Sequence, residues 1–371
     1  MKLNTLYKKT KTGRVSYVQL YSRKLKNKDE YRLFTKTGIV GSEKFNISSI
    51  LITEGKYIGK SNETNVRQQA HNELLSKYNA QFAKGYKENL EYVINSKYNT
   101  FKDHSVMPML LNKYSTSKDI PNKIGQFKYD GARTIAEKHN GEIRLKSRRG
   151  NIYNIPHILN SVTDMFNNQL DITFDGELYC HSMALQDIIS CVKNGDPNKR
   201  LSYVIYDIAV EGLTFEQRRN LLLAINTSKY DNIEIDCGIY LNNEEEVNEF
   251  YSNALEQNYE GVVICDGDSM YDFGFRSSSK TKIKPRTTSE FKCIDHYMNK
   301  GKYSKQSTLI CLTEEGKRFS VKLKGNNEQR ENWAANFEEE VKDKMITVEY
   351  RGLSNDNKPI EAVGIAIRDY E

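Results

Sequence analysis

The sequence predicts an α+β protein of two to three domains. Its 371 residues exceed the length of a typical single domain, and strand-like and helix-like patterns alternate along the chain without internal repeats. Hydrophobic residues make up 38% and charged residues 28% of the chain, a balance typical of globular enzymes. No run is apolar enough to span a bilayer, and the first residues lack the apolar core of a signal peptide, so we expect no membrane partner and a cytoplasmic protein.

Residues 1–93 predict a small domain that combines a sheet with one helix. Apolar and polar residues alternate over 15–21 and again over 31–35, which predicts strands followed by a turn at 36–38. Apolar side chains then recur every four residues over 66–82, which places one apolar stripe on a helix.

Positive charge is concentrated in this first region. Residues 1–95 contain 18 Lys and Arg against 8 Asp and Glu, a net charge of +10, whereas the remainder contains 37 against 41, a net charge of −4. Because phosphate neutralisation and counterion release drive nucleic-acid binding, the asymmetry favours a DNA-binding domain. A solubilising basic face is the alternative.

The turn Lys128-Tyr129-Asp130-Gly131-Ala132-Arg133 offers an amine, a carboxylate, a glycine and a guanidinium, which are the groups needed to capture a nucleotide phosphate covalently. Alone, such a pattern also fits a charged loop between two strands. Five further segments follow it in order: Ser147–Gly150, Phe174–Tyr179, Tyr203–Asp207, Glu260–Ile264 and Lys282–Pro285. Six segments in one fixed order make the functional interpretation much stronger.

This series resembles the motifs of the nucleotidyltransferase superfamily, and the chain is similar to ATP-dependent DNA ligases of the viral and phage type from about Met107 to the C-terminus. The resemblance implies a nucleotidyltransferase (ATP-grasp-like ligase) domain over 107–287, after a linker at 94–106, and an OB-fold β-barrel over 288–371. Short alternating runs in this last region also favour a five-stranded barrel. Residues 1–93 resemble a small α+β WGR domain, although Thr37 and Ile39 stand where that family has its tryptophan and arginine.

The resemblance implies a role for each candidate residue. Lys128 is the expected nucleophile that accepts AMP, and Lys282 and Lys284, two apart on one strand, point to the same side and suit two contacts to the α-phosphate. The other expected nucleotide-binding residues are Arg133, Arg148, Glu177, Tyr206, Val262 and Arg368. Glu260 and Glu177 are the expected metal ligands for Mg²⁺, for which Mn²⁺ can substitute. Arg133, Arg148 and Arg149 are the expected DNA contacts.

The implied function is that of an ATP-dependent DNA ligase. Such an enzyme seals nicks with a 3′-hydroxyl and a 5′-phosphate through a lysyl-AMP and a DNA-adenylate, in replication, repair or recombination. Nicked duplex DNA is the expected partner of a monomer in a bacterium or virus-infected cell, in the cytoplasm or associated with the nucleoid, and no protein partner is identifiable. An mRNA-capping guanylyltransferase, an RNA ligase and a non-catalytic nucleic-acid-binding protein are the alternatives. Six scattered cysteines suggest neither disulfides nor zinc.

Overall fold

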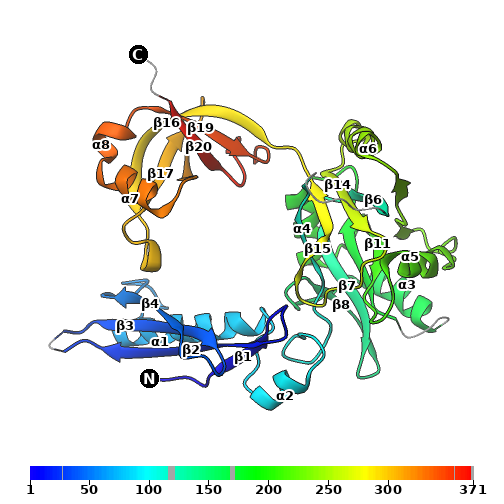
Figure 1. The fold of residues 1–371 in the computed structure, drawn as a ribbon, viewed down its shortest axis with the longest axis horizontal. Helices are drawn as coiled ribbons and strands as arrows, with labels where there is room; N and C mark the ends of the chain where they lie inside the picture. The colour runs from blue at the N-terminus through cyan, green and yellow to red at the C-terminus, as the bar shows by residue number, and fades with distance from the viewer. Residues whose placement is uncertain (27, 116–121, 168–171, 355, 369–371) are drawn as a thin grey trace.

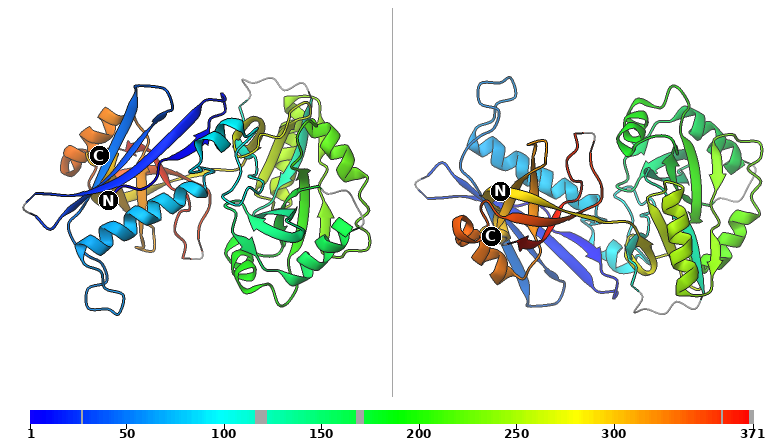
Figure 2. Two further views of the ribbon diagram at one scale, coloured as in Figure 1. Left: turned by 90° about the horizontal axis from the view of Figure 1, so that it is seen from below. Right: turned by 90° about the horizontal axis from the view of Figure 1, so that it is seen from above.

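The computed structural model describes residues 1–26, 28–115, 122–167, 172–354 and 356–368. The chain forms an N-terminal body, a two-sheet body and a C-terminal barrel (Figure 1). The barrel and the N-terminal body lie at one end of the molecule and the two-sheet body at the other (Figure 2). Within the described ranges, no helix is long and apolar enough to cross a membrane.

The N-terminal body is a four-stranded antiparallel sheet with one long helix packed on it. In sheet order the strands are β1 (Leu6–Lys9), β2 (Val15–Lys24), β3 (Tyr31–Ile39) and β4 (Phe45–Ile52), and the helix is α1 (Val66–Phe82). Asn65 begins α1 with a capping box, because its side chain accepts from Gln68 N while the Gln68 side chain accepts from Asn65 N. Leu20, Leu33 and Leu74 are buried between sheet and helix.

One local expectation about this region is wrong. Residues 36–38 form no turn, because β3 pairs with β2 as far as Ile39 and the Tyr17 ring packs over Gly38. A second, short helix, α2 (Leu90–Asn95), which Asn89 caps, ends within the first two residues of the predicted linker at 94–106.

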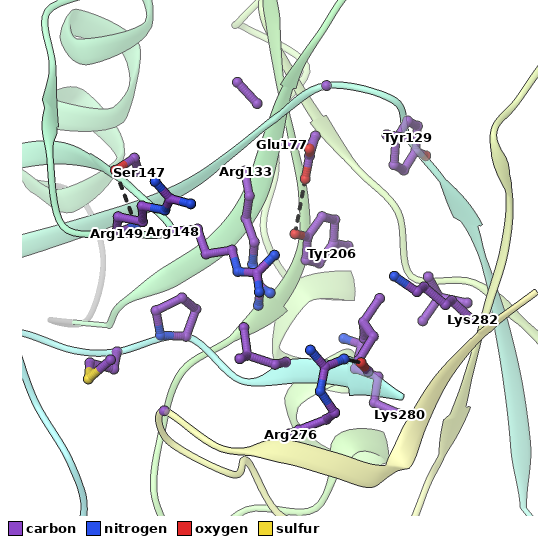
Figure 3. Close-up of a pocket in the computed structure, with 18 of the residues that line it drawn as sticks. Tyr129, Arg133, Ser147, Arg148, Arg149, Glu177, Tyr206, Arg276, Lys280 and Lys282 are labelled. Carbon is purple, nitrogen blue, oxygen red and sulfur yellow. Dashed lines mark hydrogen bonds between the residues drawn. The ribbon is translucent and has the colours of Figure 1, made fainter. Parts of the chain in front are cut away.

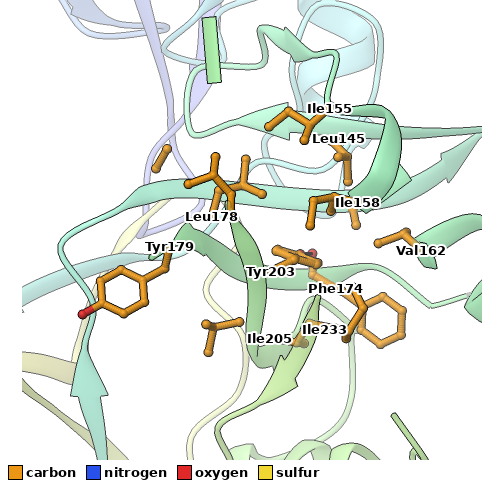
Figure 4. Close-up of a cluster of buried hydrophobic side chains, with 14 of the residues drawn as sticks. Leu145, Ile155, Ile158, Val162, Phe174, Leu178, Tyr179, Tyr203, Ile205 and Ile233 are labelled. Carbon is orange, nitrogen blue, oxygen red and sulfur yellow. Dashed lines mark hydrogen bonds between the residues drawn. The ribbon is translucent and has the colours of Figure 1, made fainter. Parts of the chain in front are cut away.

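The first sheet of the two-sheet body has six strands. In sheet order they are β12 (Ile233–Ile235), β11 (Ser202–Ile208), β10 (Phe174–Tyr179), β7 (Ala132–His139), β8 (Glu142–Ser147) and β9 (Ile152–Tyr153). The helices α3 (Pro156–Asn167) and α4 (Leu185–Asn194) cover one face, and their apolar side chains form the largest core cluster (Figure 4). Leu145, Ile158, Phe174 and Tyr203 are fully buried there.

The second sheet has five strands. In sheet order they are β13 (Ile239–Leu241), β6 (Lys123–Lys128), β14 (Gly261–Asp266), β15 (Arg276–Ile283) and β5 (Leu110–Lys113). The helix α6 (Glu244–Glu256) packs on one face through Val247 and Ala254. The helix α5 (Phe215–Leu223) packs near the other face, where Phe215 meets Ile124 and Val263.

The C-terminal strands close into the five-stranded barrel that the sequence predicts. Around the barrel they are β16 (Thr287–Met298), β17 (Ser307–Leu312), β18 (Arg318–Leu323), β20 (Val363–Arg368) and β19 (Met345–Tyr350). The short helices α7 (Asn327–Ala335) and α8 (Phe337–Glu340) lie between β18 and β19. The 3₁₀ helix η1 (Gly301–Tyr303) contacts β4, which brings the barrel against the N-terminal body.

Candidate active site

Lys128 lies at the end of β6, where the strand leaves the interior. The first four residues of β6 are buried, and a turn then leads into β7. This turn needs Gly131, because a Cβ atom there would lie 2.4 Å from the Leu178 carbonyl oxygen and 2.7 Å from Glu177 Cγ. The glycine therefore allows the lysine turn to approach the strand that carries Glu177.

Glu260 joins two of the predicted lysines. The Lys128 Nζ forms an ion pair with Glu260 Oε2, and the Lys284 Nζ lies 3.4 Å from Glu260 Oε1. The pairing of β14 with β6 positions these groups, since Gly261 lies opposite Lys128 and Glu260 N donates to the Lys128 carbonyl oxygen over 3.0 Å. Burial alone would raise the pKa of Glu260, but the charge and hydrogen bond of Lys128 outweigh it and lower that pKa.

A cavity of about 1050 Å³ lies beside Lys128, between the two sheets (Figure 3). It is large enough for a nucleotide. Its lining includes the predicted residues Lys128, Arg133, Arg148, Arg149, Glu177, Tyr206 and Lys282. Side chains distant in sequence are thereby gathered around one space.

Glu177 and Tyr206 form the inner wall of this cavity. The Tyr206 hydroxyl donates to Glu177 Oε2 over 3.3 Å, which fixes the ring against β10 (Figure 3). Burial raises the pKa of Glu177 to about 7, although the charges of Lys128 and Arg133 act in the opposite direction. Glu177 can therefore exchange a proton near neutral pH.

Cations gather along the cavity. Arg148 and Arg149 lie at one end, in the turn after β8, while Lys282 lies toward the other (Figure 3). Partial loss of solvent at the cavity rim lowers the pKa of Arg148, and the nearby charges of Arg133 and Arg276 add to the effect. Burial and the charges of Lys128 and Lys284 likewise lower the pKa of Lys282. Mutual repulsion of this kind favours a bound anion such as a phosphate.

Arg133 lines the cavity, and each of its three guanidinium nitrogens already donates one hydrogen bond within the protein. Its Nε and Nη2 donate to the two Asp175 carboxylate oxygens over 2.9 and 2.6 Å, and its Nη1 donates to the Met109 carbonyl oxygen over 2.6 Å. In this arrangement Arg133 holds β7, β10 and the segment before β5 together. The direct nucleotide or DNA contact expected from the sequence would use the remaining N–H groups of Nη1 and Nη2, since arginine has five N–H donors and three are engaged here.

Successive side chains of β14 point to opposite faces of the sheet, and Val262 points away from the cavity. Val262 is fully buried on the α6 side of the sheet, with Val247, whereas Val263 lines the cavity. Gly261 lies opposite Lys128, so Gly261 and Val263 point to the same face of the sheet as Lys128, and Val262 points to the other face. The residue of β14 that faces the cavity is therefore Val263, not the Val262 expected from the motif.

Arg368 does not reach the cavity. Its Nε donates to Thr347 Oγ1 over 2.8 Å and lies 3.3 Å from Glu290 Oε1, within the barrel. Another barrel arginine takes the place near Lys128: Arg351 Nη2 donates to Asp130 Oδ2 over 2.6 Å, and its Nη1 lies 3.7 Å from Glu260 Oε1. No sequence motif marked Arg351.

Glu361 forms a second contact across the same boundary. It lies just before β20, and its carboxylate is 3.3 Å from the Lys284 Nζ and 3.4 Å from Arg286 Nη2. Arg351 and Glu361 lie close together on the barrel because Arg351 N donates to the Ile360 carbonyl oxygen over 2.9 Å. The barrel therefore contacts the lysine turn through the cation Arg351, and the segment of Lys284 and Arg286 through the anion Glu361.

Behind the cavity lies a buried ionic cluster that the sequence did not reveal. Asp207 accepts from Arg218 Nε over 2.7 Å and from the Lys280 Nζ over 3.0 Å. Burial would raise the pKa of Asp207, but the charges of Lys280 and Arg218 outweigh it and lower that pKa. Lys280 also lies over the Tyr206 ring, 5.3 Å from its centroid, and thus connects the cluster to the cavity wall.

The described residues contain no group of three or more His, Cys, Asp and Glu side chains that could hold a metal ion. Mg²⁺ commonly binds through one or two carboxylates together with waters and the phosphates of a nucleotide. Glu260, which lies between the two lysines, fits that mode. Glu177 fits it less well, because burial raises its pKa to about 7 and so disfavours the charged carboxylate that a metal requires.

Comparison with known proteins gives consistent matches. Residues 108–284 match the family described as ATP dependent DNA ligase domain, and residues 300–368 match the family described as DNA ligase OB-like domain. The DNA ligase of African swine fever virus (isolate Tick/South Africa/Pretoriuskop Pr4/1996) is 26% identical over 344 residues, which cover 86% of this chain and 79% of that protein.

Two solved structures share the fold. A Lig E DNA ligase superimposes with a TM-score of 0.58 at 20% identity, over 70% of this chain and 98% of its own. The structure named Pmar-Lig_Pre superimposes with a TM-score of 0.65 at 17% identity, over 82% of this chain and 80% of its own. These likenesses show the arrangement of a nucleotidyltransferase domain followed by an OB barrel.

Proposed function

Because the chain belongs to the family of ATP-dependent DNA ligases, we propose that it seals nicks in duplex DNA through a covalent AMP on Lys128. The family uses ATP as the AMP donor. One observation carries the proposal: the Lys128 amine lies at the edge of a nucleotide-sized cavity, next to Glu260 and Lys284.

In the first step the neutral Lys128 amine attacks the α-phosphorus of ATP. A bond forms between the lysine nitrogen and phosphorus, the bond to the bridging oxygen breaks, and pyrophosphate leaves. The amine must first lose its proton to solvent, and the neighbouring ammonium group of Lys282 favours the neutral form because it repels a second positive charge. Lys282 and Lys284 would stabilise the charge on the α-phosphate as it is transferred.

The later steps transfer and then release AMP. The 5′-phosphate of the nick attacks the lysyl-AMP, which frees Lys128 and produces a DNA-adenylate. The 3′-hydroxyl then attacks the 5′-phosphorus, joins the strands and releases AMP. Arg148 and Arg149, both exposed at the cavity rim, would bind the 5′-phosphate and the adjoining backbone.

A magnesium ion would be held by Glu260 and would neutralise phosphate charge during transfer. Within the cavity, Tyr206 and Val263 offer an aromatic and an aliphatic surface for the adenine, and Glu177 offers a hydrogen bond for the ribose. We also propose that the enzyme acts as a monomer in the compartment that holds its DNA, the cytoplasm or nucleoid of a bacterium or the cytoplasm of an infected cell.

Labelling with radioactive nucleotide tests the proposal. The protein is incubated with Mg²⁺ and either α-labelled ATP or α-labelled GTP, and acid-stable protein adducts are measured. An AMP adduct that chases into sealed nicked DNA supports the ligase. A GMP adduct would instead indicate a capping enzyme, and an AMP adduct that seals only RNA would indicate an RNA ligase.

A further inference from the structure

The sheet of the N-terminal body has one covered and one open face. Leu20 and Leu33 point toward α1 and are buried, so the intervening residues of β2, β3 and β4 point to the other side, called here the outer sheet face. On β4, Phe45 and Ile47 are each 50% exposed and Leu51 is 43% exposed. Apolar side chains gathered on one open surface commonly mark a site of interaction.

The charge of this face has a single sign. Arg23, Arg32 and Lys36 lie on it, and no outward position of β2, β3 or β4 carries Asp or Glu. The register places Arg23 directly opposite Arg32, an arrangement of like charges that is destabilising without an anion. Among the described residues, none of the three cations has an acidic partner.

Aromatic rings are interleaved with these cations. Tyr21 and Phe34 stack across the strands with ring centroids 4.9 Å apart, and the Arg23 guanidinium lies 5.5 Å from the Tyr21 centroid. The Lys36 ammonium lies 4.0 Å from the Phe45 centroid. Rings that can contact bases beside cations that can contact phosphates are the two components of surfaces that bind unpaired strands.

We propose that the outer sheet face binds a single-stranded segment of nucleic acid. A duplex presents mainly hydrated phosphates at its surface, which would leave Phe45, Ile47 and Leu51 facing polar groups. An unpaired strand presents base faces to these side chains and phosphates to Arg23, Arg32 and Lys36 at once. The inference rests on the proposed function for its choice of a nucleic acid, and it extends that function to unpaired strands next to a break.

Binding of a fluorescent oligothymidylate of about 16 nucleotides, measured by anisotropy, tests the proposal, with a hairpin duplex of matched length as the comparison. Arg23→Gln/Arg32→Gln/Lys36→Gln removes the charges, and Phe45→Ser/Leu51→Ser removes apolar contacts. Lys60→Gln/Arg67→Gln/Lys77→Gln removes the same charge elsewhere in the N-terminal body and serves as the matched control. Thermal melting of each variant verifies folding.

We expect wild-type protein to bind the single strand more tightly than the duplex. The charge variant should lower the slope of log affinity against log salt by about 2 units, because each lost phosphate contact on a single strand removes about 0.7. The apolar variant should weaken binding about tenfold at an unchanged slope, since stacking does not release counterions. The control should lose clearly less affinity for the single strand than the charge variant.

Three results would overturn the proposal. The first is an equal loss of affinity for the single strand in the control and charge variants. The second is tighter binding of the duplex than of the single strand, and the third is a wild-type dimer that Phe45→Ser/Leu51→Ser dissociates. AMP labelling is measured in parallel and should be the same in all variants. If the wild type forms no AMP adduct, the proposed function fails, while the oligothymidylate comparison still decides the role of this face.

Discussion

The two-sheet body contains ion pairs whose two side chains are both buried, whereas each ion pair described within the N-terminal body includes a side chain that is more than half exposed. In the two-sheet body, Asp207 is fully buried between Arg218 and Lys280, at 2.7 and 3.0 Å. In the N-terminal body, the pair of Lys24 and Asp29 is exposed, with 54% and 68% of the side chains accessible.

This difference matches two tasks. Buried, paired charges fix distances and respond little to salt, which suits a site that must align an amine with a phosphate. Exposed charges hold no fixed geometry and are screened by salt, which suits reversible binding of a polyanion. The variants described below compare charged side chains that are buried, half-buried and exposed.

The largest effect is expected at Lys128. Lys128→Ala should abolish the AMP adduct, because no other lysine among the described residues both lines the cavity and forms an ion pair with Glu260. The measurement is acid-stable labelling with α-labelled ATP. The variant should still seal a nick that carries a DNA-adenylate, since only the first step needs the amine. Labelling at the wild-type rate would refute the assignment.

The second largest effect concerns stability. Asp207→Asn leaves Arg218 and Lys280 without a compensating carboxylate, and breaking such a buried pair costs about 3–5 kcal/mol of unfolding free energy. Asp29→Asn in the N-terminal body is the matched control and should leave the free energy of unfolding nearly unchanged. Chemical denaturation of both variants measures the contrast, and equal destabilisation would show that the two bodies do not differ in this way.

The sequence predicted the features that local patterns encode and missed those that depend on tertiary packing. The barrel strands β17 and β19 occur within the region where short alternating runs predicted a five-stranded barrel, because two-residue alternation is a local signal. The cavity assembles many of the predicted residues because they belong to strands whose order is fixed by pairing.

Tertiary placement explains what the sequence could not give. Val262 and Val263 are equally apolar, so only the register of β14 against β6 reveals that Val263 faces the cavity. Arg133 could not be known to be engaged, because its partner Asp175 is 42 residues away. Arg351 approaches Lys128 only because the barrel packs against the two-sheet body, a contact that no local pattern encodes.

Glu177 should produce a smaller, pH-dependent effect. Burial raises its pKa from 4.5 to about 7, so the folded state favours the protonated form. The protonated Glu177 side chain therefore contributes fully to the free energy of unfolding below pH 4.5, and this contribution is lost as the pH rises through 7. Glu177→Gln mimics the protonated form and should stabilise the protein at pH 8 by roughly 2–3 kcal/mol.

The control for this effect is the same comparison at low pH. Below pH 4.5 the wild type and Glu177→Gln should unfold at the same denaturant concentration. A stability difference that does not change between pH 4 and pH 8 would mean that Glu177 is ionised normally and that its burial is without electrostatic consequence.

The smallest effect is expected where charges are neither buried nor fully exposed, at the contact between the barrel and the lysine turn. The side chains of Arg351 and Asp130 are 20% and 35% exposed. Arg351→Gln keeps a hydrogen-bonding side chain but loses the charge that attracts Asp130 and Glu260. The barrel should then dock less often, and formation of the AMP adduct should slow about tenfold. Sealing of a pre-adenylated nick should change less, because that reaction does not require the barrel beside the free amine.

Lys342→Gln, which removes one charge from an exposed ion pair with Glu338 on the barrel, is the matched control and should label at the wild-type rate. Equal slowing of adduct formation and of nick sealing by Arg351→Gln would place Arg351 in the general architecture of the protein, whereas selective slowing of the adduct would make this half-buried pair the link between barrel position and chemistry.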